Sequence, residues 1–184
     1  MVALLAPGGP AAVREVAART LRRLCMDSAR NRDGVREAGG VAALVGLLAP
    51  GGPAAVREQA AAALANLCAG SAADPDSIRE AGGVGALVGL LAPGGAAALQ
   101  QTAAVALANL CAASEQNRAC VKACGGDAAL YALLTQGGAA AAVQDAVAAA
   151  LDNLGYDCSA VHAGGPGAPR GWSGPWHLLP SRRA

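Results

Sequence analysis

An internal repeat of 43 residues constrains this chain of 184 residues more than any other feature of its sequence. The motif Leu-Leu-Ala-Pro-Gly-Gly begins at Leu4, Leu47 and Leu90, and a variant, Leu-Leu-Thr-Gln-Gly-Gly, begins at Leu133. A fixed period of this length is typical of solenoids, in which each unit buries its apolar face against its neighbours. The chain is therefore expected to be a linear stack of units followed by a tail.

Two helices are predicted in the first half of each unit. Asp74 is a candidate N-cap with Pro75 in the first helical position, and this short helix is expected to end at the Gly82-Gly83 pair. A second helix is predicted over 84–91, where apolar residues recur at the spacing i, i+3, i+4 and i+7.

A longer third helix completes the unit. It is predicted over 97–111 and, one unit earlier, over 53–68, with Pro53 in the first helical position. The chain contains 50 Ala and no Phe. Because Ala is the best helix former and the smallest apolar side chain, this composition favours many closely packed helices. The expected fold class is all-α.

The repeat resembles that of the armadillo family. Asn31-Arg32 followed by Val35 and by 38–40 (Ala-Gly-Gly) is similar to the family's first helix, 41–48 to its second, and 63–67 (Ala-Leu-Ala-Asn-Leu) to the end of its third. The resemblance implies a right-handed superhelix of three-helix repeats, an α-solenoid.

The resemblance divides the chain into four units and a tail. Full repeats are expected over 27–68, 69–111 and 112–154, after a partial repeat over 1–26 and before a tail over 155–184. Because Met1 aligns with Leu44, the partial repeat starts inside a second helix. We therefore expect the sequence to be a fragment, an alternative transcript, or a gene model truncated at its 5′ side.

The resemblance also implies a binding site. In armadillo proteins the third helices line a concave groove that holds an extended peptide, and Asn residues of successive repeats clamp its main chain. The corresponding residues here are Asn66, Asn109 and Asn153, with Arg23 in the same place in the partial repeat and Arg19 one turn before it. An amide side chain both donates and accepts, so it can pair with any peptide bond. The alternative is that these amides bond neighbouring turns within the solenoid.

Nuclear-import adapters of the family carry Trp one turn before each Asn, to hold basic side chains. The matching positions here are Arg19, Ala62, Val105 and Ala149, so recognition of a nuclear signal is not expected. Arg19 and Arg23 are expected to form a solvated basic end of the stack. The alternative is that this pair receives an acidic stretch of a protein partner, as the basic grooves of catenin-like members do.

Composition excludes several classes of function. A net charge of +1 lacks the basic character of a general nucleic-acid binder. The uncharged run over 81–114 is interrupted by 93–95 (Pro-Gly-Gly), which leaves pieces too short for a membrane span. The N-terminus has no signal-peptide pattern, so we expect a cytoplasmic protein, with the nucleus as the alternative.

Neither catalysis nor metal binding is expected. Both histidines, His162 and His177, lie in the tail, so the repeats contain no histidine base. Cys120 and Cys124 lack a nearby histidine and make at most a weak zinc site. Three other cysteines recur at the repeat period and are expected to fill one buried position, namely Cys25, Cys68 and Cys111. We expect no enzyme, no cofactor and no small-molecule substrate.

The tail has six Gly and four Pro in 30 residues and shows no period. It is expected to be disordered, or alternatively to dock a motif with Trp172 and Trp176 on the last repeat. The predicted function is a non-catalytic scaffold that binds an extended peptide. The alternatives are a structural subunit of a cytoskeletal, axonemal or membrane-associated assembly, and a fragment of a longer armadillo protein such as a ubiquitin-ligase substrate receptor.

Overall fold

A computed structural model describes residues 1–26, 28–69, 73–135 and 140–158. These residues form a short 3₁₀ helix and a series of α-helices, three for each full unit. Their bounds are η1 (Val2–Leu5), α1 (Ala11–Met26), α2 (Ala29–Glu37), α3 (Gly40–Gly46), α4 (Ala54–Cys68), α5 (Ala73–Glu80), α6 (Gly83–Gly89), α7 (Ala97–Ala113), α8 (Glu115–Ala123), α9 (Gly126–Thr135) and α10 (Ala141–Asn153).

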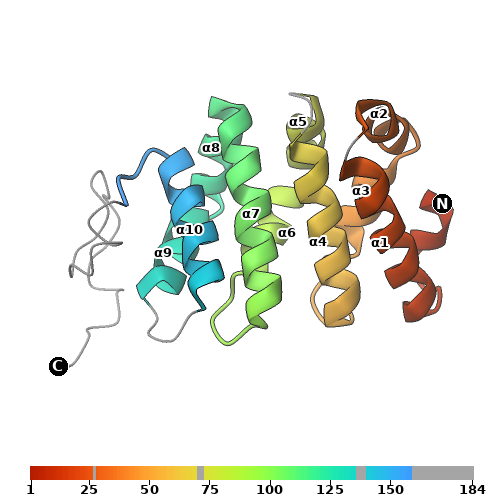
Figure 1. The fold of residues 1–184 in the computed structure, drawn as a ribbon, viewed down its shortest axis with the longest axis horizontal. Helices are drawn as coiled ribbons and strands as arrows, with labels where there is room; N and C mark the ends of the chain where they lie inside the picture. The colour runs from red at the N-terminus through yellow and green to blue at the C-terminus, as the bar shows by residue number, and fades with distance from the viewer. Residues whose placement is uncertain (27, 70–72, 136–139, 159–184) are drawn as a thin grey trace.

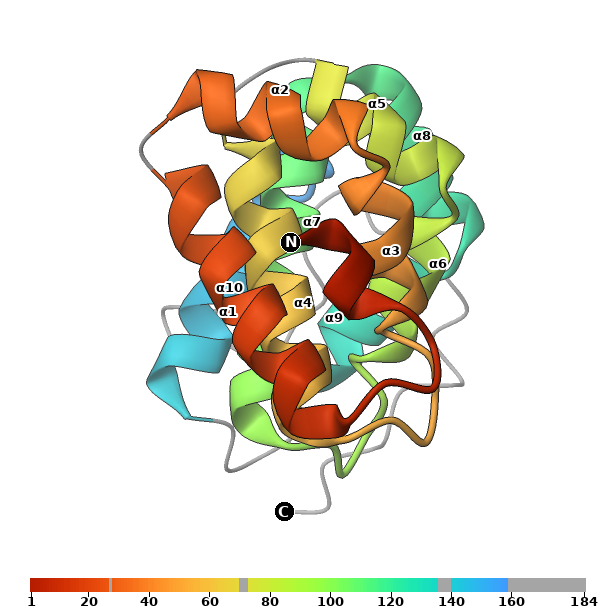
Figure 2. The same ribbon diagram turned by 90° about the vertical axis from the view of Figure 1, so that its right-hand side faces the viewer.

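The four longest helices, α1, α4, α7 and α10, lie side by side and form one layer of the molecule (Figure 1). Each is the third helix of its unit. The second helices lie on the other side of this layer, and the first helices, α2, α5 and α8, lie across one end of the stack, at the top of Figure 2. The all-α solenoid predicted from the repeat is confirmed.

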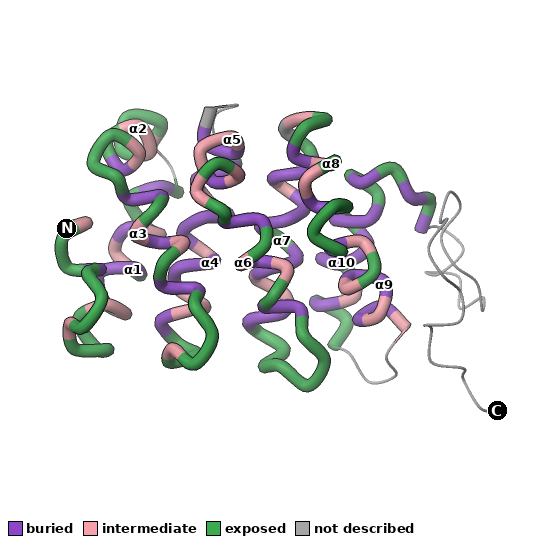
Figure 3. The backbone as a smooth tube through the Cα atoms, turned by 180° about the vertical axis from the view of Figure 1, so that it is seen from behind, coloured by how far each residue is buried: buried purple, intermediate pink, exposed green. Residues whose placement is uncertain are grey.

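The core runs continuously from unit to unit, as Figure 3 shows, and it is built from one set of positions repeated along the chain. Leu64 and Leu107, 43 residues apart, are fully buried, and so are Ala61 and Ala104. The small alanines let the third helices approach one another closely, while the leucines fill the space behind them. This packing explains the high Ala content.

The two glycines of the Gly-Gly pair that recurs in each unit have different structural roles. Its first member, such as Gly82 with φ +76°, precedes the second helix in the left-handed conformation that glycine adopts most readily. Its second member, Gly83, lies against Ile78, and a Cβ atom there would come within 2.9 Å of the Ile78 carbonyl oxygen. The pair therefore sets both the turn and the close contact of the first two helices.

Two details of the predicted helix starts were wrong. Pro53 is the N-cap residue of α4, with ψ 132°, so the helix begins one residue later than predicted. Asp74 is not a cap but lies within α5, where it is fully buried, and its Oδ1 is 3.3 Å from Nε of Arg36 on α2. The carboxylate thus joins the first helices of two successive units.

The packed part of the chain extends to Cys158, beyond the tail boundary expected after Leu154. Tyr156 and Cys158 are buried, and the Tyr156 hydroxyl donates to Oδ2 of Asp127 at 3.0 Å. Nζ of Lys122 lies 5.0 Å from the centre of the Tyr156 ring. These residues cover the end of the last unit, whereas Trp172 and Trp176 lie outside the described residues.

Candidate peptide-binding face

The outer surface of α1, α4, α7 and α10 carries the residues that the sequence singles out for binding. We call it the third-helix face. Asn66 on α4, Asn109 on α7 and Asn153 at the end of α10 occupy the same place in three consecutive units. Asn66 and Asn109 are half-buried and Asn153 is exposed. The structure therefore places the three amides in one row across the solenoid.

Each amide of this row makes the same hydrogen bond to the helix before it. Nδ2 of Asn66 donates to the Arg22 carbonyl oxygen at 2.9 Å, Nδ2 of Asn109 to that of Ala65 at 3.1 Å, and Nδ2 of Asn153 to that of Ala108 at 3.0 Å. The sequence left open that these amides form hydrogen bonds within the solenoid instead of binding a ligand. The structure contains such bonds.

These bonds use only part of each amide. A bond to one carbonyl occupies a single N–H, and no hydrogen bond to Oδ1 of these three residues is found among the described residues. One acceptor and one N–H of each amide are left for another partner. Because the bonded N–H fixes the orientation of the side chain in advance, less conformational freedom is lost when a ligand binds.

In the partial unit, a charged residue, Arg23, takes the place of the asparagine in this row. Arg23 on α1 is exposed and has no ion-pair partner among the described residues. Arg19, one turn earlier, is also exposed, and it forms an ion pair with Glu15 on the same helix. Of the two arginines, Arg23 is the one whose guanidinium forms no ion pair within the described part of the chain.

Two further rows follow the same period. One turn before the amides lie Ala62, Val105 and Ala149, of which Val105 is an exposed large apolar side chain. One more turn back, Glu58, Gln101 and Asp145 occupy equivalent places and are half-buried or exposed. Sequence reasoning did not single out this outer row, although its members follow the 43- and 44-residue spacings of the amides.

Three cysteines that recur at the repeat period are buried thiols with weak acidity. The recurring position predicted for Cys25, Cys68 and Cys111 is buried in each unit. Burial raises the pKa of the Cys25 thiol to about 11 and that of Cys68 and Cys111 to about 12. A thiolate is the form that attacks electrophiles and binds metals, so these environments disfavour both. Within the described ranges no group of three or more potential metal-binding side chains occurs.

We expect thiol alkylation to distinguish two classes of cysteine in the native protein. Cys124 is exposed and Cys120 half-buried, whereas Cys25, Cys68, Cys111 and Cys158 are buried. With a maleimide near neutral pH, Cys124 should react first and the buried four should react only after unfolding. Peptide mapping by mass spectrometry measures the order, and equally fast labelling of Cys68 and Cys124 would contradict this packing.

No helix in the part of the chain that the structure describes combines the length and apolar character needed to cross a membrane.

A family model described as Armadillo/beta-catenin-like repeat matches residues 28–69 and 71–112. Among solved structures, an engineered protein is 34% identical, with a TM-score of 0.77 over 83% of this chain and 60% of its own. A designed armadillo repeat protein is 27% identical, with a TM-score of 0.75 over 83% of this chain and 62% of its own.

A structure of computationally designed armadillo repeat proteins for modular peptide recognition is 25% identical, with a TM-score of 0.76 over 89% of this chain and 66% of its own. This chain thus spans less than two thirds of the length of these neighbours. A comparison with curated proteins produced no match. The matched repeats, the three-helix units and the neighbouring folds agree: residues 28–69 and 71–112 are armadillo repeats, and the described part of the chain has the armadillo-type solenoid fold.

Proposed function

We propose that this chain is a non-catalytic scaffold that binds an extended peptide segment of a partner protein along the third-helix face. The observation that carries the proposal is the row of three amides, each oriented by a bond to the preceding helix and each retaining an acceptor and a donor. Similarity to designed armadillo proteins made for peptide recognition supports peptide binding by this type of scaffold.

The spacing of the row suits a peptide in extended conformation. Packed helices lie about 8–10 Å apart, and an extended chain advances about 3.3 Å per residue. Successive amides would therefore meet peptide bonds about two to three residues apart. A ligand of about ten residues would span the four units.

The amides alone do not supply a useful affinity. A hydrogen bond contributes about 0.5–1.5 kcal/mol net, whereas a micromolar complex needs about 8 kcal/mol. The remainder has to come from side chains of the ligand. Ala62 and Ala149 leave room for such side chains beside the row, and Val105 offers apolar contact at its centre.

The charges on the third-helix face suggest the composition of the partner. Arg23 and Arg19 lie on α1 at one end, while Glu58 and Asp145 lie on α4 and α10. We propose a peptide with acidic residues over α1, an apolar residue near Val105, and a basic residue near Asp145. Complementary charges of this kind favour association and fix the register of a ligand more than they add affinity.

The buried thiols and the fold family bear on catalysis and on the cellular compartment. The raised pKa values of the buried thiols, and a fold family that is generally non-catalytic, support a scaffold without enzymatic activity. Six free thiols suit a reducing compartment, so we propose the cytoplasm, with the nucleus as the alternative. A structural subunit of a larger assembly, or part of a longer armadillo protein, remains the second candidate, in which the third-helix face would not be the main contact.

Fluorescence anisotropy with a labelled peptide tests the proposed function. The probe has acidic residues at one end, leucine in the centre and lysine at the other end. The double variant Asn66→Ala/Asn109→Ala should bind it about tenfold more weakly or worse, since two main-chain contacts are lost. Circular dichroism serves as the check that the variant remains folded.

Two results would count against this proposal. One is unchanged affinity of the double variant despite lower thermal stability, which would assign the amides to the solenoid alone. The other is equal binding by Arg23→Glu, which removes the charge proposed to meet the acidic end. The matched control is Arg30→Glu, an exposed arginine on α2 rather than on the third-helix face.

A further inference from the structure

The side of the solenoid opposite the third-helix face carries two hollows between successive second helices. A hollow of about 250 Å³ lies between the end of α3 and α6, and both of these helices belong to units with all three helices. A hollow of about 340 Å³ lies in the equivalent place between η1 and α3. We call this side, which is turned toward the viewer in Figure 3, the second-helix face.

The two hollows have the same construction. Each is lined by small and apolar residues together with a single charged one, which is Arg57 between α3 and α6 and Arg14, 43 residues earlier, in the other hollow. Gly46 lines both hollows, and a Cβ atom there would meet nothing within 4 Å. Because the arrangement recurs at the repeat period, it is a property of the junctions inside the stack.

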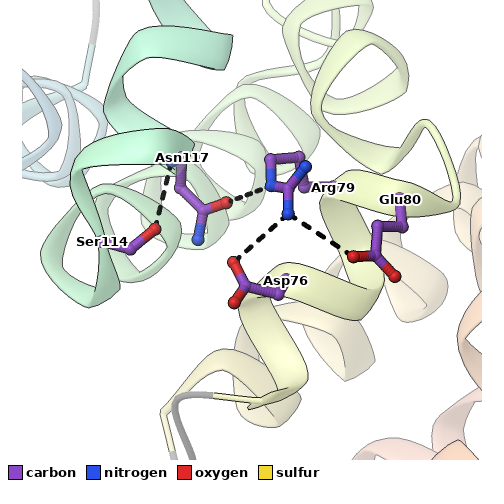
Figure 4. A network of polar contacts seen from close by, with 5 residues as sticks. All are labelled: Asp76, Arg79, Glu80, Ser114 and Asn117. Carbon is purple, nitrogen blue, oxygen red and sulfur yellow. Dashed lines mark hydrogen bonds and ion pairs between the residues drawn. The ribbon is translucent and has the colours of Figure 1, made fainter.

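The arginines of the hollows are half-buried and form no ion pair within the described ranges. Nε of Arg14 and Nε of Arg57 are buried and make no hydrogen bond there either. Arg79 on α5 behaves differently, because its guanidinium contacts two carboxylates and the amide of Asn117 (Figure 4). A carboxylate from outside the solenoid is therefore the group that complements Arg14 and Arg57.

The next unit shows that the fold does not require a charge at this place. Gln100, 43 residues after Arg57, is buried, and its Nε2 donates to the Ala92 carbonyl oxygen at 2.9 Å. A neutral amide thus suffices to hold the turn between a second and a third helix. The positive charges at the two earlier junctions are therefore free to serve a partner.

The second-helix face beside these arginines is uncharged and lacks projecting side chains. The helices α3 and α6 contain no charged residue. Their exposed residues are all Ala or Gly, namely Ala42, Gly46, Gly85 and Gly89. Nothing on these two helices keeps another helix from packing at the ordinary distance of about 8–10 Å.

The chemistry of this face suits a helix better than an extended peptide. An extended peptide needs partners for its own N–H and C=O groups, and α3 and α6 consist only of Gly, Ala, Val and Leu. Main-chain groups buried there without a partner would oppose binding. A helix pairs these groups internally. The third-helix face differs in this respect, because its amides can pair with a main chain.

A second copy of the chain and a membrane are poorer occupants. The same surface of a second copy supplies no carboxylate, since α3 and α6 contain none. A membrane surface takes up large apolar side chains, whereas the exposed residues of these helices are Ala and Gly. An acidic helix of a different protein matches both the shape and the charge of the face.

We propose that the second-helix face binds an acidic amphipathic helix of a partner protein, which crosses η1, α3 and α6 and places an apolar side chain in each hollow and a carboxylate on each arginine. Packed helices lie about 8–10 Å apart, and a helix rises about 1.5 Å per residue. The contacts of each kind are therefore about seven residues apart on the partner. Binding here leaves the third-helix face open for its own ligand.

The probe is a labelled helical peptide, held by a hydrocarbon staple, with two leucines about seven residues apart and two glutamates at the same spacing on one flank. Alanine and glutamine fill its other positions. Full-length protein is titrated into it and anisotropy is recorded. Arg14→Gln/Arg57→Gln should weaken binding about tenfold or more, because two ion pairs are lost. Gln100 shows that the fold accepts glutamine at this place.

A second variant tests the hollows themselves. Gly46→Leu puts a side chain into the space that both hollows share and should also weaken binding about tenfold or more. The matched control is Gly34→Leu, an exposed glycine of α2 where a Cβ atom likewise would meet nothing within 4 Å, and it should leave the affinity unchanged. Asn66→Ala/Asn109→Ala should bind this probe as the wild type does.

The proposal is overturned if the stapled probe does not bind, or if the arginine double variant or Gly46→Leu binds it as tightly as the wild type. Equal binding of a peptide whose glutamates are replaced by glutamine would also overturn it, and so would equal binding of an unstapled peptide with a central proline. If the probe does not bind but vesicles containing phosphatidylserine do, and Arg14→Gln/Arg57→Gln loses the vesicles, the face is a membrane contact instead.

Discussion

Replacing Gly83 by alanine is expected to lower the free energy of unfolding by about 3 kcal/mol, since an added methyl group has no room there. Its Cβ would lie 2.6 Å from Cγ2 of Ile78, 2.9 Å from the Ile78 carbonyl oxygen and 3.0 Å from Cγ2 of Val45. The isoleucine side chain can rotate away, but the carbonyl belongs to α5 and moves only with that helix. Urea denaturation followed by circular dichroism measures the loss.

Gly85 provides the control for this substitution. It lies two residues further along α6, and a Cβ atom there would meet nothing within 4 Å. Gly85→Ala should stabilise the protein by about 0.5–1 kcal/mol, because alanine is the better helix former. If Gly83→Ala were as harmless as Gly85→Ala, the close contact between the first and second helices would not be as described.

The second large effect concerns the ion pair between units. Asp74 is fully buried, and burial raises the pKa of its carboxyl group above the ordinary value of 3.8, while Arg36 acts in the opposite direction. Arg36→Ala leaves this carboxylate without its cation and should cost about 2–3 kcal/mol at neutral pH. Adding Asp74→Asn should recover most of the loss, because Asn117 serves at the equivalent position of the next unit.

The contribution of Asp74 to the free energy of unfolding changes with pH in a definite direction. A carboxyl group with a higher pKa in the folded than in the unfolded protein binds its proton more tightly when folded. Asp74 therefore disfavours folding above its folded-state pKa, and this cost disappears as the pH falls toward 3.8. Asp74→Asn should be at least as stable as the wild type at neutral pH, and the difference should shrink in acid. A variant less stable than the wild type by the same amount at both pH values would contradict this assignment.

Much of the fold can be predicted from the repeat. A period of 43 residues fixes the order of the helices, and each unit repeats the glycine and proline residues that separate one helix from the next. The buried cysteine position and the break between α6 and α7 at 93–95 follow from the pattern alone. Asp74 was misassigned as a cap because Asp-Pro is a common helix start, and its partner Arg36 lies 38 residues earlier. Only the stacking of units brings the two together.

The candidate site, too, could be predicted only in part from the sequence. The row of asparagines is evident from the sequence, but its bonds to carbonyls 44 or 45 residues earlier depend on how closely the third helices pack. The cover formed by Tyr156 and Cys158 has no counterpart in the repeat, so periodicity gives no sign of it. Its hydroxyl contact with Asp127 joins residues 29 positions apart.

On the proposed function, the amides of the third-helix face bind the main chain of a peptide. A thermodynamic cycle between Asn109→Ala and N-methylation of the ligand tests it most directly, because N-methylation removes one peptide N–H. Anisotropy is measured for the four combinations of protein and peptide, with the methyl group moved along the central residues. At one position the two changes are expected not to be additive, with a coupling of about 1 kcal/mol. Strictly additive effects at every position would contradict it.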